Sequence, residues 1–418
     1  MEPLEHLRFL KPGEVREITR RWGTPVFVYD EATLQEQARE ALAFQAPFGL
    51  TVRYAMKANA NRHVLTALNN LGIAIDASSG FEAERALRAG IAPGQILVTA
   101  QELPANLTSL VERGVHFNAC SLHQLETYGR LFPATGVSVR INPGLGSGHS
   151  HKTNVGGPAS SFGIWYEYVA EIQAIAARHQ LTIHRLHTHI GSGTDLVVWT
   201  KVARLSLEQV RAFPDVTTLN LGGGFKVARM REEKATDLQP VSRAVADALQ
   251  AFSENTGRQL QLEIEPGTFL VANAGALITT INDIVDTGKD GYQFLKLDSG
   301  MTDLLRPTLY AAQHPLVVVN DRPEAPGKYA VVGHCCESAD LLTPHPDDPE
   351  VVAQRWLQKA GIGDPLVIEG AGAYCASMSA HNYNSYPVTP EVMRRKDGTL
   401  LEISRRQTFE EMLQRETP

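Results

Sequence analysis

Residues 50–61 read Leu50-Thr51-Val52-Arg53-Tyr54-Ala55-Met56-Lys57-Ala58-Asn59-Ala60-Asn61. The apolar run up to Met56 predicts a β-strand, and the small and polar residues after it predict a turn that begins at Lys57. A lysine partly shielded from water at the carboxyl end of a barrel strand loses solvation. Its amine then becomes able to bond covalently with an aldehyde. A surface lysine that merely ends a strand would have the same local sequence, so the rest of the chain must decide.

Short apolar runs alternate with helical stretches on both sides of this segment. Together with the strand before Lys57, the runs make eight predicted strands: 50–56, 73–76, 95–99, 115–118, 137–140, 183–187, 217–221 and 262–265. Helical periodicity lies between most of them, as in 82–88, 121–131, 166–179 and 241–256. Eight strand and helix units predict an α/β fold, a (β/α)8 TIM-type barrel over residues 34–277.

An open, doubly wound sheet uses the same local unit, so periodicity alone does not exclude it. Polar residues at or just after the predicted strand ends favour the barrel, because a barrel collects its catalytic groups there while an open sheet uses mainly its central crevice. These residues are Lys57, Asp76, Asn118, Arg140, His189, Gly222, Gly223, Gly224 and Glu265.

The pattern changes after about residue 275. Short apolar runs at 316–319, 329–332 and 366–368 are separated by proline-rich turns with little helical pattern between them. This predicts a second, mostly β-sheet domain, made of residues 1–33 and 278–418 and completed by the early strand 26–29.

Composition excludes several classes of protein. Lys and Arg number 39 against 46 Asp and Glu, which gives a net charge of −7 and makes nucleic acid an unlikely partner. No apolar run is long enough to cross a membrane, and the first twenty residues do not resemble a signal sequence, so we expect a cytoplasmic protein. Four cysteines do not make a disulfide framework. His149 and His151 have no third ligand nearby, so no metal site is expected.

Two segments after predicted strands suggest a phosphate and an aromatic ring as ligands. The run Gly222-Gly223-Gly224 offers backbone N–H groups with no Cβ in the way. Ser192 could donate to the same phosphate, and His189 could lie flat against an aromatic ring. A flexible glycine turn and a histidine with an ordinary core role remain the alternatives for these segments.

Glu265 ends the last predicted barrel strand. A carboxylate beside a pyridine nitrogen keeps that nitrogen protonated, and a pyridinium withdraws electrons strongly. An ordinary salt bridge is the alternative. In the second domain, the thiol of Cys336 could protonate a carbanion, Glu337 could hold an ammonium group, and the phenol of Tyr374 could reach a ligand. Cysteines are also often small buried apolar residues, and a packing turn would resemble the segment around Tyr374.

These segments, in this order, resemble the fold type III pyridoxal-phosphate decarboxylases, the alanine racemase and ornithine decarboxylase-like family, and most of all its diaminopimelate decarboxylases. The resemblance covers nearly the whole chain, from Thr24 to Thr408. Its most specific motifs are the segments 148–154, 162–165, 336–338, 378–379 and 382–384.

The resemblance implies pyridoxal 5′-phosphate as cofactor and a role for each matching residue. Lys57 matches the lysine that binds the cofactor covalently, His189 the histidine on its ring, and Glu265 the partner of its ring nitrogen. The family positions that bind the phosphate group match Ser192, Gly222, Gly223 and Gly224, with Tyr374 close by. Asp76 and Arg140 match family positions that support the lysine and the face of the cofactor ring.

The resemblance also implies how the substrate, a small amino acid, is bound. Cys336 matches the general acid that reprotonates Cα, and Glu337 matches the group that holds the distal amino end. Both reach the neighbour's barrel in this family, which implies a homodimer with shared active sites. Arg306 and Tyr310 match the residues that grip the distal carboxylate. The expected activity is decarboxylation of meso-2,6-diaminopimelate at its D-centre to L-lysine, the last step of lysine biosynthesis.

One departure from the family pattern concerns the substrate. The usual turn is Glu-Pro-Gly-Arg, whereas this chain has Glu265-Pro266-Gly267-Thr268, so an arginine used for anionic groups is missing. Either Arg306 alone suffices, or another arginine replaces the missing one. Otherwise the substrate is a basic amino acid without a second carboxylate, such as D-lysine or D-ornithine. A non-catalytic homologue is a further alternative, although Lys57, Glu265 and Cys336 are all present.

Overall fold

The computed structural model describes residues 4–145, 156–189 and 193–417. The chain divides into two compact units. Unit 1 contains residues 1–34, 228–233 and 271–418, and unit 2 contains residues 35–227 and 234–270. The short segment 228–233 therefore belongs to unit 1, although the chain on both sides of it belongs to unit 2.

Unit 2 is a closed parallel barrel. All eight predicted strands are present, each strand pairs in parallel with its neighbours, and β10 pairs with β2 to close the ring. The strands are β2 (Leu50–Ala55), β3 (Ala74–Ala77), β4 (Ile96–Val98), β5 (His116–Ala119), β6 (Gly136–Asn142), β8 (Thr182–Thr188), β9 (Thr218–Asn220) and β10 (Gln261–Ile264), with the short β7 (Ile164–Trp165) beside β6. The predicted (β/α)8 fold is confirmed.

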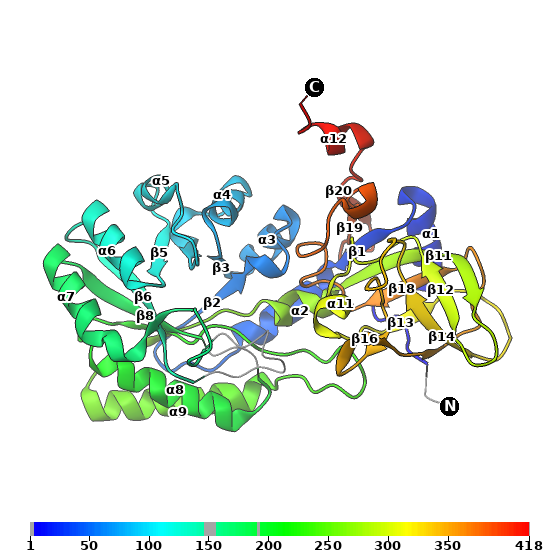
Figure 1. Ribbon diagram of the computed structural model, residues 1–418. Helices are drawn as coiled ribbons and strands as arrows, with labels where there is room; N and C mark the ends of the chain where they lie inside the picture. Colours follow the sequence, from blue (N-terminus) through cyan, green and yellow to red (C-terminus); the bar gives the residue numbers. More distant parts are fainter. Residues whose placement is uncertain (1–3, 146–155, 190–192, 418) are drawn as a thin grey trace. The chain divides into compact units, whose positions relative to one another are not determined.

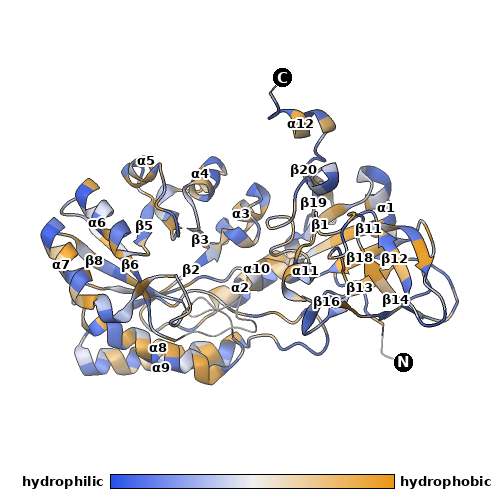
Figure 2. Ribbon diagram, in the orientation of Figure 1, coloured by the Kyte–Doolittle hydropathy of each residue, from blue (hydrophilic) through white to orange (hydrophobic). Residues whose placement is uncertain are grey.

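Helices lie outside these strands (Figure 1). They are α2 (Glu31–Leu42), α3 (Arg62–Asn69), α4 (Gly80–Arg88), α5 (Leu107–Glu112), α6 (Leu122–Leu131), α7 (Val169–His179), α8 (Leu196–Arg211), α9 (Leu238–Thr256) and α10 (Thr268–Val271). Side-chain caps fix where several begin; Ser79 accepts from the N–H of Glu82, for example, and Asp237 accepts from that of Gln239. Figure 2 shows hydrophobic and hydrophilic residues alternating along α9, as expected for a helix with one buried face.

Charged groups are paired inside the barrel. Glu263 on β10 accepts hydrogen bonds from Arg53 on β2 and Arg185 on β8, with nitrogen to oxygen distances of 2.9 and 3.2 Å, and all three side chains are buried. Buried charges are tolerated when they are paired and hydrogen-bonded in this way. Pairing with Glu263 explains why two arginines are tolerated on the otherwise apolar strands of the barrel.

Unit 1 is mainly one mixed β-sheet, as predicted. Its strands are β1 (Val26–Asp30), β11 (Gly275–Asp286), β12 (Gln293–Leu297), β13 (Leu316–Val318), β14 (Gly327–Val332), β17 (Arg355–Leu357), β18 (Pro365–Glu369), β19 (Glu391–Arg394) and β20 (Leu400–Ser404), with β15 (Pro344–His345) and β16 (Asp348–Val352) as a separate pair. The early strand β1 lies between β11 and β19. Its helices are α1 (Pro12–Trp22), α11 (Arg306–Tyr310) and α12 (Phe409–Leu413).

The core of unit 1 packs on this sheet. Phe27 and Tyr29 of β1 are buried against Leu277 of β11 and Ile368 of β18. Figure 2 shows the corresponding strands as mostly hydrophobic. Within the described residues, no helix is both long and apolar enough to cross a membrane.

Candidate active site

Lys57 lies at the carboxyl end of the barrel strands. β2 ends at Ala55, and a single 3₁₀ turn, Met56–Ala58, carries the lysine. Met56 and Ala58 are buried while Lys57 is exposed, so the turn is anchored and its side chain projects outward. The positive charge of Lys57 lowers the pKa values of Asp76 and His189, although burial affects both groups more. The amine therefore lies among the polar groups that end the neighbouring strands.

Two buried carboxylates occupy the same end of the barrel. Burial raises the pKa of Asp76, which lies on β3. Burial also raises the pKa of Glu265, which directly follows β10, to about 8, and the negative charge of Asp76 contributes to that shift. One oxygen of Glu265 accepts a 2.6 Å hydrogen bond from the amide of Asn220. A buried carboxylate with so high a pKa favours a partner that carries or shares a proton.

Two neutral histidines stand beside these carboxylates. Burial, reinforced by the positive charge of Arg140, lowers the pKa values of His187 and His189 well below the usual range. His187 Nδ1 lies 2.7 Å from the amide nitrogen of Asn118, and its Nε2 lies 3.4 Å from Glu265 Oε2. His189 Nδ1 is buried and has no hydrogen-bond partner among the described residues. A neutral imidazole with an unmet nitrogen suits a site that receives a polar aromatic ligand.

The glycine run after β9 must be glycine for steric reasons. A Cβ on Gly222, whose φ is +69°, would lie 2.6 Å from the ring of His189. A Cβ on Gly223 would lie 2.1 Å from the carbonyl oxygen of Glu265. The expectation of three available N–H groups is wrong in one respect, because the N–H of Gly222 donates to Asn220 Oδ1 at 2.8 Å. The donors that this turn offers to an anion are those of Gly223 and Gly224.

Cys336 and Glu337 are exposed residues of a loop in unit 1 that follows β14. The buried carboxylate of Asp340 organises this loop by accepting from the N–H groups of Met301 and Cys335, at 2.6 and 2.9 Å. Burial and the charge of Asp340 raise the pKa of Cys335 to about 12. Of the adjacent cysteines, Cys336 is the accessible one on a firmly held backbone.

Arg306 lies near Tyr310 in unit 1, and it also lies near Cys375, the residue after Tyr374. The guanidinium carbon of Arg306 is 6.0 Å from the ring centre of Tyr310 on the same helix, α11. Burial raises the pKa of Cys375 to about 11, and the positive charge of Arg306 opposes that shift. Arg306 is thus close to the segment that carries Tyr374, whose φ of +56° is rare for a residue with a side chain.

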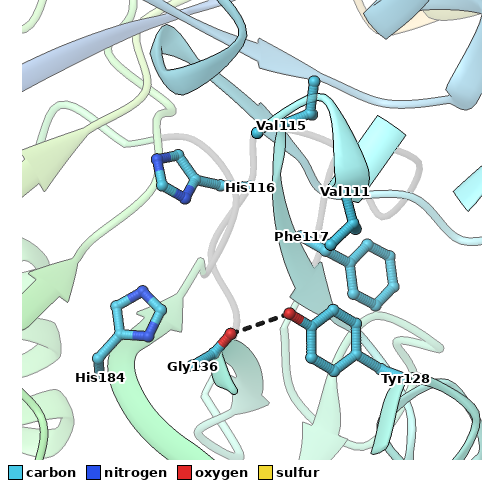
Figure 3. A pocket seen from close by; sticks show the side chains of 8 residues that line it. Val111, Val115, His116, Phe117, Tyr128, Gly136 and His184 are labelled. Atoms are coloured by element: carbon cyan, nitrogen blue, oxygen red, sulfur yellow. Dashed lines mark hydrogen bonds between the residues drawn. The ribbon is translucent and has the colours of Figure 1, made fainter. Parts of the chain in front are cut away.

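A small pocket at the opposite end of the barrel is not the candidate site. It has a volume of about 200 Å³ and is lined by residues that include His116, Gly136 and His184 (Figure 3). His116 and Gly136 are the first residues of β5 and β6, so the pocket lies at the amino ends of the strands, where barrel residues usually serve stability. A hydrogen bond from Tyr128 to the carbonyl of Gly136 closes one side.

The predicted residues thus form one group in each unit. Unit 2 brings together Lys57, Asp76, Arg140, His189, Gly222, Gly223, Gly224 and Glu265, whereas Arg306, Tyr310, Cys336, Glu337 and Tyr374 belong to unit 1. Ser192, His149 and His151 lie outside the described residues.

Two residues that sequence reasoning did not single out position Glu265. These are Asn220, which donates to its carboxylate, and His187, which faces that carboxylate from β8. The signal available for both was a polar residue near the carboxyl end of an otherwise apolar strand.

The group in unit 2 fits pyridoxal phosphate. An exposed amine can meet its aldehyde, and a buried proton-accepting carboxylate can meet its ring nitrogen. A neutral histidine with an unmet nitrogen can lie by its ring, and a turn in which a Cβ on Gly222 or Gly223 would collide can approach its phosphate.

Comparisons with known proteins agree with this reading. The model of the family described as "Pyridoxal-dependent decarboxylase, pyridoxal binding domain" matches residues 32–272. Diaminopimelate decarboxylase of Escherichia coli strain K12 is 36% identical over 403 residues, which are 94% of this chain and 93% of the relative.

Solved structures give the same result. A crystal structure of a diaminopimelate decarboxylase superposes with a TM-score of 0.89 at 35% identity and covers 96% of this chain and 95% of its own. The Helicobacter pylori diaminopimelate decarboxylase complexed with L-lysine gives a TM-score of 0.84 at 27% identity and covers 96% and 98%. The chain therefore belongs to the pyridoxal-dependent decarboxylases, the family that includes the diaminopimelate decarboxylases, and its cofactor is pyridoxal phosphate.

Proposed function

We propose that the protein is a carboxy-lyase that decarboxylates meso-2,6-diaminopimelate at its D-centre and releases L-lysine, the last step of lysine biosynthesis. The observation that carries this proposal is the meeting of Lys57, Glu265 and the glycine turn at one end of one barrel. The relatives reported above are diaminopimelate decarboxylases, which favours this substrate over D-lysine or D-ornithine. The presence of Lys57, Glu265 and Cys336 argues against a non-catalytic homologue.

Each residue of the group in unit 2 has a chemical task in this proposal. Bound pyridoxal phosphate supplies the electron sink that stabilises the charge left when carbon dioxide departs. Lys57 would supply the amine that bonds to the aldehyde of the cofactor. Glu265 would keep the proton on the ring nitrogen, and Asn220 holds that carboxylate in position, with neutral His187 beside it.

The remaining residues of this group position the cofactor. His189 lies against the ring, and Asp76 and Arg140 support Lys57 and the ring face. Gly223 and Gly224 would donate their backbone N–H groups to the phosphate, together with Ser192 and Tyr374. Gly222, whose N–H is taken by Asn220, would contribute by leaving the turn without a Cβ. Each of these roles is a proposal that the family resemblance supports.

The group in unit 1 serves the substrate. Arg306 and Tyr310 hold the distal carboxylate, with the phenol of Tyr374 nearby, and Glu337 holds the distal ammonium. Cys336 returns a proton to Cα after carbon dioxide has left. Cys336 is exposed, whereas Cys335 is only partly exposed and has a raised thiol pKa, and this difference supports the choice between the adjacent thiols.

We also propose a cytoplasmic homodimer with shared active sites. Residues 34–277 bind the cofactor, while residues 1–33 and 278–418 form the β domain that brings Cys336 and Glu337 to the partner's barrel. The exposed loop around Cys336, ordered by Asp340, supports a role in which the thiol acts outside its own unit.

Mixing two inactive variants tests the shared sites. Lys57→Ala and Cys336→Ala should each be inactive alone. Unfolding and refolding them together should restore about a quarter of wild-type activity, because random pairing gives half mixed dimers with one intact site each. Carbon dioxide release from the mixture is the measurement. No recovery, in a mixture shown by size and mass to contain mixed dimers, would mean that both residues act within one chain.

The substrate is tested by measuring carbon dioxide release from meso-diaminopimelate, D-lysine, D-ornithine and L-ornithine at equal concentrations. We expect the highest kcat/KM for meso-diaminopimelate, with L-lysine as its product. Preference for D-lysine or D-ornithine would replace the proposed substrate, and inactivity toward all four would remove the proposed function.

A further inference from the structure

Arg229 lies in the short segment of unit 1 that interrupts the sequence of unit 2. Its side chain is 7% exposed. Its Nε donates to the carbonyl oxygen of Gly370 at 3.0 Å, and its own carbonyl oxygen accepts from the guanidinium of Arg8. The segment 228–233 is thereby fixed to unit 1 by two arginines, and the guanidinium of Arg229 is held at a defined place.

This guanidinium is incompletely bonded. Arg229 Nη2 and Arg306 Nε are both buried, and neither atom has a hydrogen-bond partner among the described residues. A guanidinium has five N–H donors in a planar fork that matches the oxygens of a carboxylate. Buried donors of a charged group are costly to leave unmet, so two such donors in one cluster indicate an anionic ligand.

The charge balance around Arg229 also indicates an anionic ligand. Burial lowers the pKa of Arg229 to about 9, and Arg306 is the neighbouring charge that lowers it most. Arg229 therefore remains positive at pH 7. Burial raises the pKa of Glu369 to about 7, so this carboxylate compensates only in part, and His314 is neutral because burial and both arginines lower its pKa. The cluster carries more positive than negative charge.

Arg229 is also close to a segment already assigned to the substrate. Both Arg306 and Arg229 lower the pKa of buried Cys375, so both guanidinium groups lie near this thiol. Cys375 directly follows Tyr374, whose φ of +56° is a costly conformation of the kind that collects at ligand sites. Arg306 and Arg229 therefore both lie near Cys375, the residue that follows Tyr374 in the chain.

We propose that Arg229 is a specificity residue that binds the distal carboxylate of the substrate together with Arg306. The second guanidinium that the family takes from its Glu-Pro-Gly-Arg turn is absent here, where Thr268 stands. Arg229 supplies that charge from a different part of the sequence. The inference rests on the proposed function, because it concerns the carboxylate that distinguishes meso-diaminopimelate from D-lysine and L-lysine from cadaverine.

The test compares ligands that differ only in this carboxylate. Arg229→Met should raise KM for meso-diaminopimelate by about 10- to 100-fold, the usual effect of losing a hydrogen bond between charged groups. KM for D-lysine should change less than about 3-fold. Calorimetry on the cofactor-loaded enzyme should show the same loss of affinity for L-lysine and little change for cadaverine. The KM of Arg229→Lys for meso-diaminopimelate should lie between those of wild type and Arg229→Met, because an ammonium group keeps the charge but lacks the planar, two-donor geometry of a guanidinium.

Arg394→Met is the matched control. This arginine of unit 1 pairs with Glu14 and Asp30, so its loss should lower the melting temperature without changing the ratio of affinities for the two ligands of each pair. Equal losses for both ligands in Arg229→Met, or none for either, would overturn the inference and make Arg229 a structural brace for Gly370. If Arg229→Met does not fold, Arg229→Lys decides by the same ratios.

A failure of the proposed function can be distinguished from a failure of the inference about Arg229. Wild-type enzyme that binds L-lysine more tightly than cadaverine, yet releases no carbon dioxide from meso-diaminopimelate, would remove the proposed reaction while the affinity ratios still decide the role of Arg229. Wild-type enzyme without preference for the carboxylate-bearing ligand of either pair would overturn the inference, even if decarboxylation is observed.

Discussion

Lys57→Ala should abolish decarboxylation, with a fall in kcat of about 10⁴- to 10⁶-fold, the range seen when a covalent catalytic group is removed. The reason is chemical. Without an amine at the end of β2, no residue there forms the covalent bond with the cofactor that substrate exchange requires. The purified variant should also lose the visible absorption of the lysine-bound cofactor. Steady-state release of carbon dioxide and an absorption spectrum measure both effects.

Borohydride reduction of the wild-type enzyme fixes the cofactor to its lysine and gives a positive assignment. Peptide mapping by mass spectrometry should then find the cofactor mass on the peptide that contains Lys57. Lys201→Ala is the control, because Lys201 is an exposed lysine of α8 in the same unit and its loss should leave spectrum and activity unchanged. A label on any other lysine would end the assignment of Lys57.

The barrel could be predicted because its strands are buried on both faces. Each of the eight apolar runs is therefore a continuous signal, and all eight became strands of the closed sheet. The strands of unit 1 were harder to predict from the sequence. Its longest strand, β11 (Gly275–Asp286), has a buried first half and a second half that is mostly half-buried or exposed. A pattern that changes along one strand has no single period to detect.

Much of the site could be predicted from local sequence, because the residues that follow the strands of a barrel lie together at one end of it. Lys57, Glu265 and the glycine turn needed only that rule. It could not identify Arg229, which depends on a six-residue segment joining the other unit. Nor could it show that Asn220 occupies the N–H of Gly222 as well as binding Glu265. Both facts depend on contacts between residues far apart in the sequence.

Glu265→Gln should reduce kcat/KM by about 10²- to 10³-fold, the usual cost of removing one preorganised charged partner. A glutamine amide has almost the shape of the carboxyl group and can still meet Asn220, but it cannot hold a proton on the ring nitrogen. The variant should therefore keep its bound cofactor while losing turnover. Glu265→Asp retains the charge at a shorter reach and should lose less. Unchanged kcat/KM in Glu265→Gln would remove Glu265 from the reaction.

The pH dependence of stability gives a second measure of Glu265, independent of activity. Its pKa rises from 4.5 to about 8 on folding of the cofactor-free protein, so the folded state binds more protons between these values. Stability should then fall as pH rises through this window and level off above it. Glu265→Gln should remove that fall, which appears as the difference between the melting temperatures of variant and wild type from pH 5 to 8.

Glu263, two residues earlier on β10, is the internal comparison for this effect. Burial opposes its ionisation, but Arg53 and Arg185 outweigh burial and lower its pKa. Its contribution is therefore present above pH 4.5 and is lost only as pH falls through the lowered pKa. Glu263→Gln should destabilise the protein throughout pH 5 to 8 without changing the slope. These two buried glutamates thus differ because two arginines pair with Glu263, whereas burial and the charge of Asp76 outweigh Arg140 at Glu265. The carboxyl group with the raised pKa is the one that suits a protonated ring nitrogen.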